Sequence, residues 1–305
     1  MANVTDAAFR QVIAKYGKPD VMFTEFVSCD GLVSAGQKKL LVDFMYTESE
    51  RPIVAQIFGS KPENFYKTAL LIQELGFDGI DINMGCPDRN IEKQGAGACL
   101  MKNPKLAQEI IRETKRGAGK LPVSVKTRIG YNKNELSQWL PALLEAEPAA
   151  ITIHARTRKE MSLVPARWDT IAEAVRIRDQ YGSKTLILGN GDVKDLADAE
   201  QKIKATGADG VMIGRGIFGN PWLFDKKIDY AKMPVAEKLR VMVEHTYLFE
   251  KVLGEHKNFA IMKKHYKAYV NGFDGAKELR IKLMEGAETA ADVERIVADF
   301  LRTLN

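Results

Sequence analysis

The chain has 305 residues, of which 45% are hydrophobic and 28% charged, and its 45 basic and 40 acidic side chains give a net charge of +5. This composition is ordinary for a soluble globular protein and excludes disorder, collagen and coiled coil. No apolar stretch approaches the roughly 18 residues of a membrane-spanning helix. The three separated cysteines cannot form a disulfide framework, and no secretion signal opens the chain, so we expect a cytoplasmic protein.

Short apolar runs rich in β-forming residues recur along the first two thirds, and each is followed by a stretch of helical periodicity. Asn103 and Pro104, for example, predict the start of one helix, and Gly117 predicts its end. Alternating strands and helices predict a parallel sheet, and uniformly apolar strands predict burial on both faces. The seven strands are expected at residues 21–27, 52–59, 79–85, 122–130, 149–156, 185–191 and 210–216.

Seven consecutive βα units favour an α/β protein with a (β/α)8 TIM barrel over an open doubly wound sheet. The strand number is one short, because the chain starts in a loop that enters a helix at 6–16, so we expect the first strand to be missing at the N-terminus. The sequence predicts a barrel domain at 1–228 followed by a small helical domain at 229–305. Within the second domain only helical periods occur, at 235–253, 258–271, 276–284 and 290–304.

Polar side chains gather where the predicted strands end, which is where a TIM barrel places its active site. The interiors of the same strands are apolar, as a purely structural role would require. Burial alone does not explain why so many strands end in a side chain that can donate a hydrogen bond, so this pattern indicates an enzyme. The strand-end residues are Glu25, Ser28, Gln56, Asn83, Cys86, Lys126, Arg128, His154, Arg156, Asn190, Asp192 and Arg215.

The last two predicted strands end in glycine-rich turns, GNGD at 189–192 and GRGIFG at 214–219. Glycines let backbone N–H groups approach an anion, and Arg215 adds a positive charge. The second turn also matches the dinucleotide fingerprint GxGxxG, but no further strand follows to complete a βαβ unit. We therefore expect the two turns to hold a mononucleotide-type phosphate, such as that of a flavin.

Three of the strand-end residues could carry chemistry. A thiol with an unperturbed pKa of about 8.5 keeps its proton at neutral pH, so Cys86 could act as a general acid, although a buried structural cysteine is the alternative. Lys126 could form a Schiff base, hold a phosphate, or stabilise negative charge on a reduced flavin ring. His154 could be a general acid or a phosphate donor.

The helical tail has a local excess of positive charge. Residues 257–282 contain seven Lys or Arg against two acidic residues, so they can contact a phosphate backbone or form a solvated helix face. One helix face carries Lys263, Lys264 and Lys267, and Arg280 follows downstream. The opposite apolar set is expected to be core rather than a base-stacking platform. It consists of Phe259, Met262, Tyr266 and Tyr269.

The ordered motifs of the chain resemble those of the bacterial tRNA-dihydrouridine synthases, from Met1 to about Met284. The most diagnostic segment is GIDINMGCP together with the GAGA run that follows it. The segments that carry the resemblance are MANVTDAAFR, TEFVS, QIFG, GFDGIDINMGCP, GAGACLM, VSVKTRIG, ITIHART, PARWD, GNGDV and GADGVMIGRGIFGNPWLF.

The resemblance implies an FMN-dependent barrel, NADPH as reductant, and a helical domain that binds tRNA. It implies that a D-loop uridine is reduced to 5,6-dihydrouridine, with Cys86 as proton donor, Lys126 at the flavin, and a uracil near Asn83, Arg128 and Arg156. Lys263, Lys264, Lys267 and Arg280 would contact the tRNA. The implied flavin ligands are Met1, Ala2, Gln56, Lys126, His154, Asn190, Gly191, Asp192, Gly214 and Arg215.

Other functions stay open at this point. The chain could be an FMN-dependent oxidoreductase of a free pyrimidine, a lyase that uses Lys126 as a Schiff-base nucleophile, or a catalytically impaired, truncated RNA-binding homologue. We expect a monomer whose partner is tRNA, with no metal, membrane or DNA partner.

Overall fold

A computed structural model describes residues 4–303 of the chain. Its contacts group the chain into two compact units. Among the described residues, the barrel unit consists of residues 26–41 and 52–215, and the helical unit of residues 4–25, 42–51 and 216–303. Residues 4–25 thus group with the helical unit by contact, while the domain boundary at residue 228 stays a prediction.

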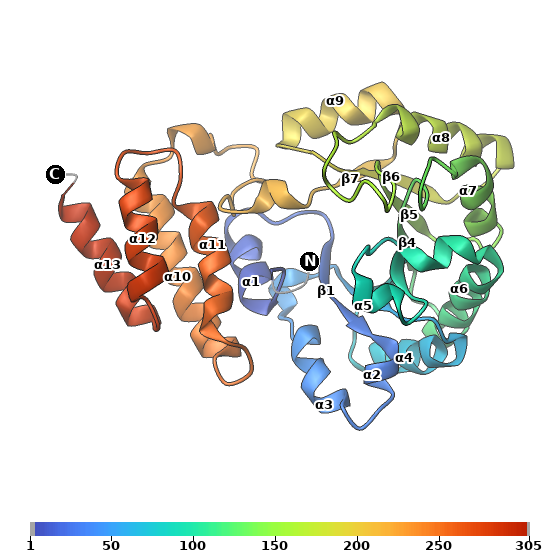
Figure 1. Ribbon diagram of the computed structural model, residues 1–305, viewed down its shortest axis with the longest axis horizontal. Helices are drawn as coiled ribbons and strands as arrows, with labels where there is room; N and C mark the ends of the chain where they lie inside the picture. Colours follow the sequence, from blue (N-terminus) through green and yellow to red (C-terminus); the bar gives the residue numbers. More distant parts are fainter. Residues whose placement is uncertain (1–3, 304–305) are drawn as a thin grey trace. The chain divides into compact units, whose positions relative to one another are not determined.

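Seven strands form one sheet whose spatial order follows the sequence. From β2 to β7 every neighbouring pair is parallel. The sheet curls into part of a barrel with helices around it (Figure 1), so the predicted TIM-barrel class is confirmed. The strands are β1 (Met22–Ser28), β2 (Ile53–Phe58), β3 (Gly79–Asn83), β4 (Val123–Arg128), β5 (Ala150–His154), β6 (Leu186–Asn190) and β7 (Gly210–Met212).

The ends of β4, β5 and β6 are level with one another, β3 ends two residues earlier, and this register positions the polar residues. Asn83 lies opposite Lys126, and Arg128 lies opposite His154. His154 in turn lies opposite Asn190. Because parallel strands present their carboxyl ends at one edge, the predicted strand-end residues of β3 to β6 come together there.

The helices of the barrel unit connect its strands. Asn103 caps α6 by accepting a hydrogen bond from Leu106 N–H, and Pro104 begins the helix, as predicted. The prediction that Gly117 ends this helix is wrong, because Gly117 lies within α6, which runs to Ala118. The absence of a side chain at Gly117 instead lets α6 pack closely against the backbone of α4. A Cβ at Gly117 would lie 2.4 Å from the Tyr66 carbonyl oxygen. The helices are α2 (Cys29–Leu32), α3 (Gln37–Leu40), α4 (Pro62–Glu74), α5 (Arg89–Glu92), α6 (Pro104–Ala118), α7 (Leu136–Leu144), α8 (Asp169–Tyr181) and α9 (Leu196–Thr206).

The helical unit is built from five longer helices around its own apolar core. Met262, Tyr266 and Tyr269 are fully buried in that core, as predicted. The predicted helix at 258–271 is shorter than expected, because Asn258 instead caps a short 3-10 turn through Ala260 N–H. The helices are α1 (Ala7–Tyr16), α10 (Val235–Leu253), α11 (Met262–Tyr269), α12 (Ala276–Gly286) and α13 (Ala290–Arg302).

Across residues 4–303, every helix is too short or too polar to cross a membrane.

Candidate active site

A buried carboxylate organises one side of the barrel mouth. Asp81 on β3 is fully buried, and both of its oxygens accept hydrogen bonds, from Ser124 Oγ at 2.6 Å and from Gln56 Nε2 at 2.7 Å. The Gln56 Oε1 then accepts a hydrogen bond from Asn83 Nδ2 at 3.2 Å. Burial raises the pKa of Asp81. Sequence reasoning missed Asp81, although a single acid inside an otherwise apolar strand is the signal that could have found it.

The loop after β3 holds Cys86 by its backbone. Asn83 Oδ1 accepts hydrogen bonds from Gly85 N–H at 3.1 Å and from Cys86 N–H at 3.0 Å. The Cys86 carbonyl oxygen accepts a third from Ala98 N–H at 3.0 Å. Neighbouring Gly97 has a φ of +61°, and a Cβ there would lie 2.8 Å from that same carbonyl oxygen. The loop conformation therefore requires glycine at position 97.

The Cys86 side chain is half-buried, and its burial raises the pKa of the thiol. A raised pKa keeps the proton on sulfur at neutral pH, where a thiol must carry it to act as an acid. The Cys86 thiol thus has the protonation state that a proton donor requires.

The end of β4 carries two positively charged side chains, Lys126 and Arg128. Lys126 Nζ donates to Asn190 Oδ1 at 3.2 Å, and Asn190 Nδ2 donates to the Met212 carbonyl at 2.8 Å, so the amide of Asn190 is fixed in orientation. Burial, followed by the charge of Arg128, lowers the pKa of Lys126 to about 8. Arg128 is 6% exposed, and burial lowers its pKa to about 10. Both side chains remain charged at neutral pH.

His154 at the end of β5 is neutral. Burial and then the positive charge of Lys126 lower its pKa to about 2. Arg156 Nη1 lies 3.1 Å from His154 Nε2, and a guanidinium can only donate, so Nε2 is the acceptor. The single proton of the imidazole is therefore on Nδ1, which leaves His154 with one hydrogen bond to donate.

A carboxylate holds two arginines at the ends of β5 and β7. Asp192 Oδ2 accepts from Arg156, and its Oδ1 accepts from Arg215 Nη2 at 3.1 Å. Burial opposes the change, but a hydrogen bond from Ala166 N–H and the two arginines lower the pKa of Asp192. Asp192 thus fixes the arginines rather than presenting a bare negative charge.

The two glycine-rich turns differ in the room they leave. Gly191 has a φ of +118°, and a Cβ there would meet His154 Cδ2 at 3.0 Å. A Cβ on Gly214 would meet no atom within 4 Å, and the neighbouring Arg215 side chain is 64% exposed. Backbone beside open space next to an exposed arginine suits an anionic group.

The predicted site residues fall in both units. Met1 and Ala2 lie outside the described residues. The four predicted tRNA contacts Lys263, Lys264, Lys267 and Arg280 lie in the helical unit. The others lie in the barrel unit, namely Gln56, Asn83, Cys86, Lys126, Arg128, His154, Arg156, Asn190, Gly191, Asp192, Gly214 and Arg215.

The positive charges of the helical unit are not equivalent. Lys264 and Lys267 on α11 are exposed. Lys263 Nζ, in contrast, donates to the Met284 carbonyl at 2.6 Å, and Arg280 Nη1 donates to the Val270 carbonyl at 2.7 Å. Lys264 and Lys267 therefore have the freer ammonium groups for a phosphate.

Lys257, which begins the basic stretch of the sequence, is only 12% exposed. Its Nζ lies 2.5 Å from Glu25 Oε2 and 2.6 Å from Asp43 Oδ1. The interpretation of Lys257 as part of a basic face is therefore wrong, because two carboxylates from distant parts of the sequence bind it inside the helical unit.

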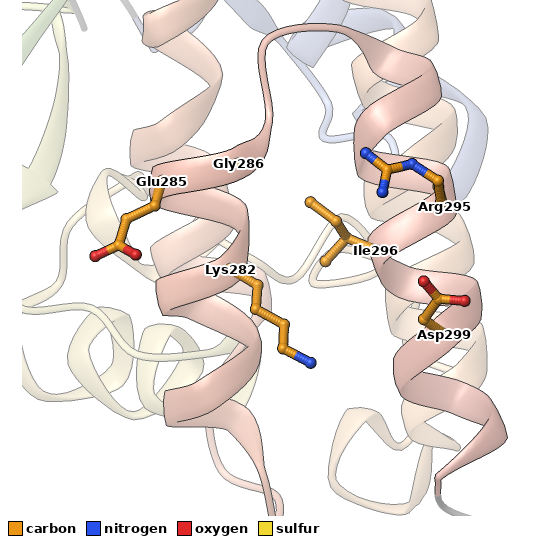
Figure 2. Close-up of a pocket in the computed structure, with 6 residues that line it drawn as sticks. All are labelled: Lys282, Glu285, Gly286, Arg295, Ile296 and Asp299. Atoms are coloured by element: carbon orange, nitrogen blue, oxygen red, sulfur yellow. The ribbon is translucent and has the colours of Figure 1, made fainter.

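A recess of about 410 Å³ lies between α12 and α13 (Figure 2). Ile296 points into it and Glu285 points away, so its walls mix apolar and charged groups. None of the predicted site residues lines this recess. Its lining consists of Lys282, Glu285, Gly286, Arg295, Ile296 and Asp299.

Comparisons with known proteins agree over the whole chain. The family model described as dihydrouridine synthase (Dus) matches residues 1–305. A probable tRNA-dihydrouridine synthase of Staphylococcus aureus (strain COL) is 40% identical over 304 residues, which cover 98% of this chain and 91% of the relative. Probable tRNA-dihydrouridine synthase 2 of Bacillus subtilis (strain 168) is 40% identical over 305 residues, which cover 99% of this chain and 92% of the relative.

Among solved structures, the old yellow enzyme homologue of Zymomonas mobilis has a TM-score of 0.53 at 13% identity, over 76% of this chain and 85% of that one. This likeness concerns the fold alone. The Staphylococcus aureus and Bacillus subtilis relatives match over nearly the whole chain and are named tRNA-dihydrouridine synthases, so they do not favour the free-pyrimidine and impaired-homologue alternatives. The chain belongs to the dihydrouridine synthase family of oxidoreductases.

Proposed function

We propose that this chain is a tRNA-dihydrouridine synthase that reduces the C5–C6 double bond of a D-loop uridine, with FMN as the flavin and NADPH as the reductant. The names of its relatives support the tRNA substrate. The observation that carries the proposal is the position of the protonated Cys86 thiol. Asn83 holds the backbone of Cys86 at the edge of the sheet where Lys126 and His154 also lie.

The flavin ligands in this proposal come from the barrel unit. Lys126 and the Nδ1–H of His154 supply donors, and Arg215 with the open space beside Gly214 would accommodate the phosphate. Gln56 has a fixed amide orientation because Asp81 accepts from its Nε2. When bound and reduced, the flavin supplies a hydride to C6 of the uracil.

The protein completes the reduction with a proton. Hydride at C6 places enolate-like negative charge on the uracil, which N–H donors and nearby cations stabilise. Cys86 then transfers its Sγ proton to C5, so hydride and proton together saturate the double bond, and water returns a proton to the thiolate. Lys126 and Arg128 keep positive charge near that thiolate, which eases its formation.

The tRNA would reach this site with its target base flipped out of the stack. Exposed Lys264 and Lys267 are the proposed phosphate contacts of the helical unit. Lys263 and Arg280 already donate to backbone carbonyls, so they serve the tRNA only if those hydrogen bonds are exchanged.

The first test is a visible absorbance spectrum of the purified protein, followed by release of the chromophore and single-turnover reduction of unmodified tRNA. We expect bound FMN, and we expect Cys86→Ala to retain FMN and tRNA binding but to lose at least about 100-fold in rate, the usual size of a general-acid contribution. Cys99→Ala is the matched control, because Cys99 is also half-buried and has no role in the proposal. An unchanged rate in Cys86→Ala would refute the proton-donor role.

A further inference from the structure

The guanidinium of Arg128 is bound almost entirely by backbone carbonyl groups. Nε donates to the Gly85 carbonyl at 2.8 Å. Nη1 donates to the Thr157 carbonyl at 3.0 Å and to the Met161 carbonyl at 2.8 Å. With the side chain 6% exposed and two of its three nitrogens occupied, little of this arginine is left to meet a substrate.

The first of these contacts acts on the peptide group that carries Cys86. Arg128 binds the Gly85 carbonyl, and Asn83 Oδ1 accepts from the N–H of the same peptide group, at Cys86. The peptide group between Gly85 and Cys86 is thus held at its oxygen by one side chain and at its nitrogen by another. This peptide plane is therefore held at both ends, and Ala98 N–H holds the next one by donating to the Cys86 carbonyl. With both flanking peptide groups held, the direction of the Cα–Cβ bond of Cys86 is set.

The other two contacts bind Arg128 to the loop after β5, so the Arg128 side chain links that loop to the loop after β3. Thr157 and Met161 both belong to the former, and Met161 has a φ of +52°, a conformation that needs support from its surroundings. A second link joins the same two segments, because Arg158 Nε donates to Glu92 Oε1 at 2.8 Å. Arg158 makes no contact with the Gly85 carbonyl among the hydrogen bonds of the described residues, so only the Arg128 link reaches the cysteine peptide.

We propose that Arg128 is a positioning residue that acts through Cys86, holding the thiol in place by clamping the Gly85 carbonyl to the loop at 157–161, rather than a residue that binds the uracil. The inference rests on the proposed role of Cys86. It differs from the uracil contact that family resemblance implies for Arg128. An arginine suits this task because its planar fork can donate to several carbonyls at once, whereas a lysine offers a single ammonium point.

A double-mutant cycle tests the inference in the flavin-loaded enzyme with unmodified tRNA. Arg128→Met is expected to slow single-turnover reduction by about 10–100-fold, the cost of misplacing a reacting group by roughly 1 Å. The KM for tRNA should stay within about threefold, because no substrate contact is removed. In the Cys86→Ala background the same substitution should cost less than about threefold more, because residues that act as a unit are not additive.

The outcomes separate the inference from the proposed function. A further loss of 10-fold or more in the Cys86→Ala background would show that Arg128 acts independently of the thiol and would overturn the inference. If Cys86→Ala alone leaves the rate unchanged, the proposed role of Cys86 fails and the inference falls with it. Arg158→Met is the matched control, because it cuts the second link between the loops and leaves the Gly85 carbonyl bound. A loss in Arg158→Met as large as that in Arg128→Met also overturns the inference.

A second measurement covers the case in which Arg128→Met does not fold. Arg128→Lys keeps the charge but cannot reach three carbonyls, so the Cys86 loop should loosen. Peptide mapping after iodoacetamide treatment should then show Cys86 alkylated at least about threefold faster than in the wild type, with Cys99 unchanged as the internal reference. Equal Cys86 rates in the two proteins would overturn the inference.

Discussion

Replacing Lys257 by methionine is expected to destabilise the helical unit strongly. Lys257 is 12% exposed and binds Glu25, which is 3% exposed, and Asp43, which is 26% exposed. Burial alone would lower the pKa of Lys257, but the two carboxylates raise it, so the ammonium is charged in the folded state. Lys257→Met removes the cation and leaves a buried carboxylate, Glu25, and a half-buried one, Asp43, without it.

The size of the effect follows from that burial. Breaking a buried ion pair by removing one partner costs about 3–5 kcal/mol, because the remaining charge is uncompensated. Here the remaining charges are two, and the second oxygen of Glu25 is buried without a hydrogen-bond partner in the described part of the chain. We therefore expect a loss of free energy of unfolding in the upper part of that range.

Urea unfolding at neutral pH measures this loss, and pH supplies a further check. Burial raises the pKa of Asp43, and Lys257 opposes that rise, so without Lys257 the protonated form of Asp43 favours folding more strongly. The deficit of Lys257→Met relative to the wild type should therefore shrink as the pH is lowered toward about 5. Exposed Lys267→Met is the control and should stay within about 0.5 kcal/mol of the wild type. A loss in Lys257→Met of under about 1 kcal/mol, or one that grows on acidification, would refute the reasoning.

Three further predictions concern single positions. Burial raises the pKa of Asp6, the cap of α1, to about 6, so the protonated carboxyl favours folding and its contribution to stability should be lost as the pH rises from about 4 to 6. In Asp6→Asn this part of the pH dependence of urea unfolding should be absent, and its persistence would contradict the assignment. Gly191→Ala should cost about 1–3 kcal/mol of stability through its positive φ, while Gly214→Ala, where a Cβ meets open space, should leave thermal unfolding almost unchanged. Equal melting temperatures of the two glycine variants would argue against strain at 191. Lys267→Ala should weaken tRNA binding and reduce the slope of log Kobs against log salt by about 1, and a titration showing the wild-type slope would exclude a phosphate contact.

Local periodicity was enough to predict the strands and α10, which runs over 235–253 as expected. It could not predict the burial and the ion pairs of Lys257, because the carboxylates that bind this residue are those of Glu25 and Asp43, more than 200 positions away in the chain. A pattern of charges in a helical stretch carries no information about partners so distant.

The site divides in a similar way. Strand ends predicted which residues of the barrel unit would gather, since the parallel register sets Asn83 beside Lys126 and His154 beside Asn190. What each side chain then binds was not predictable, because it depends on loops whose backbone carbonyls have no signature in the sequence. Arg128 is the clearest case, with three such carbonyls as its partners.

The Asp81 network has one more consequence, which concerns polarity. A carboxylate that accepts at both oxygens forces the Gln56 amide to present Nε2 toward it, which turns Oε1 toward Asn83. Asn83 must then offer its own Nδ2 to Gln56, and its Oδ1 is left to face the Cys86 N–H. Each amide has two orientations, yet a single acid two residues before Asn83 selects one for both. The chain of hydrogen bonds thus has a direction, and an asparagine at position 81 would remove the group that determines it.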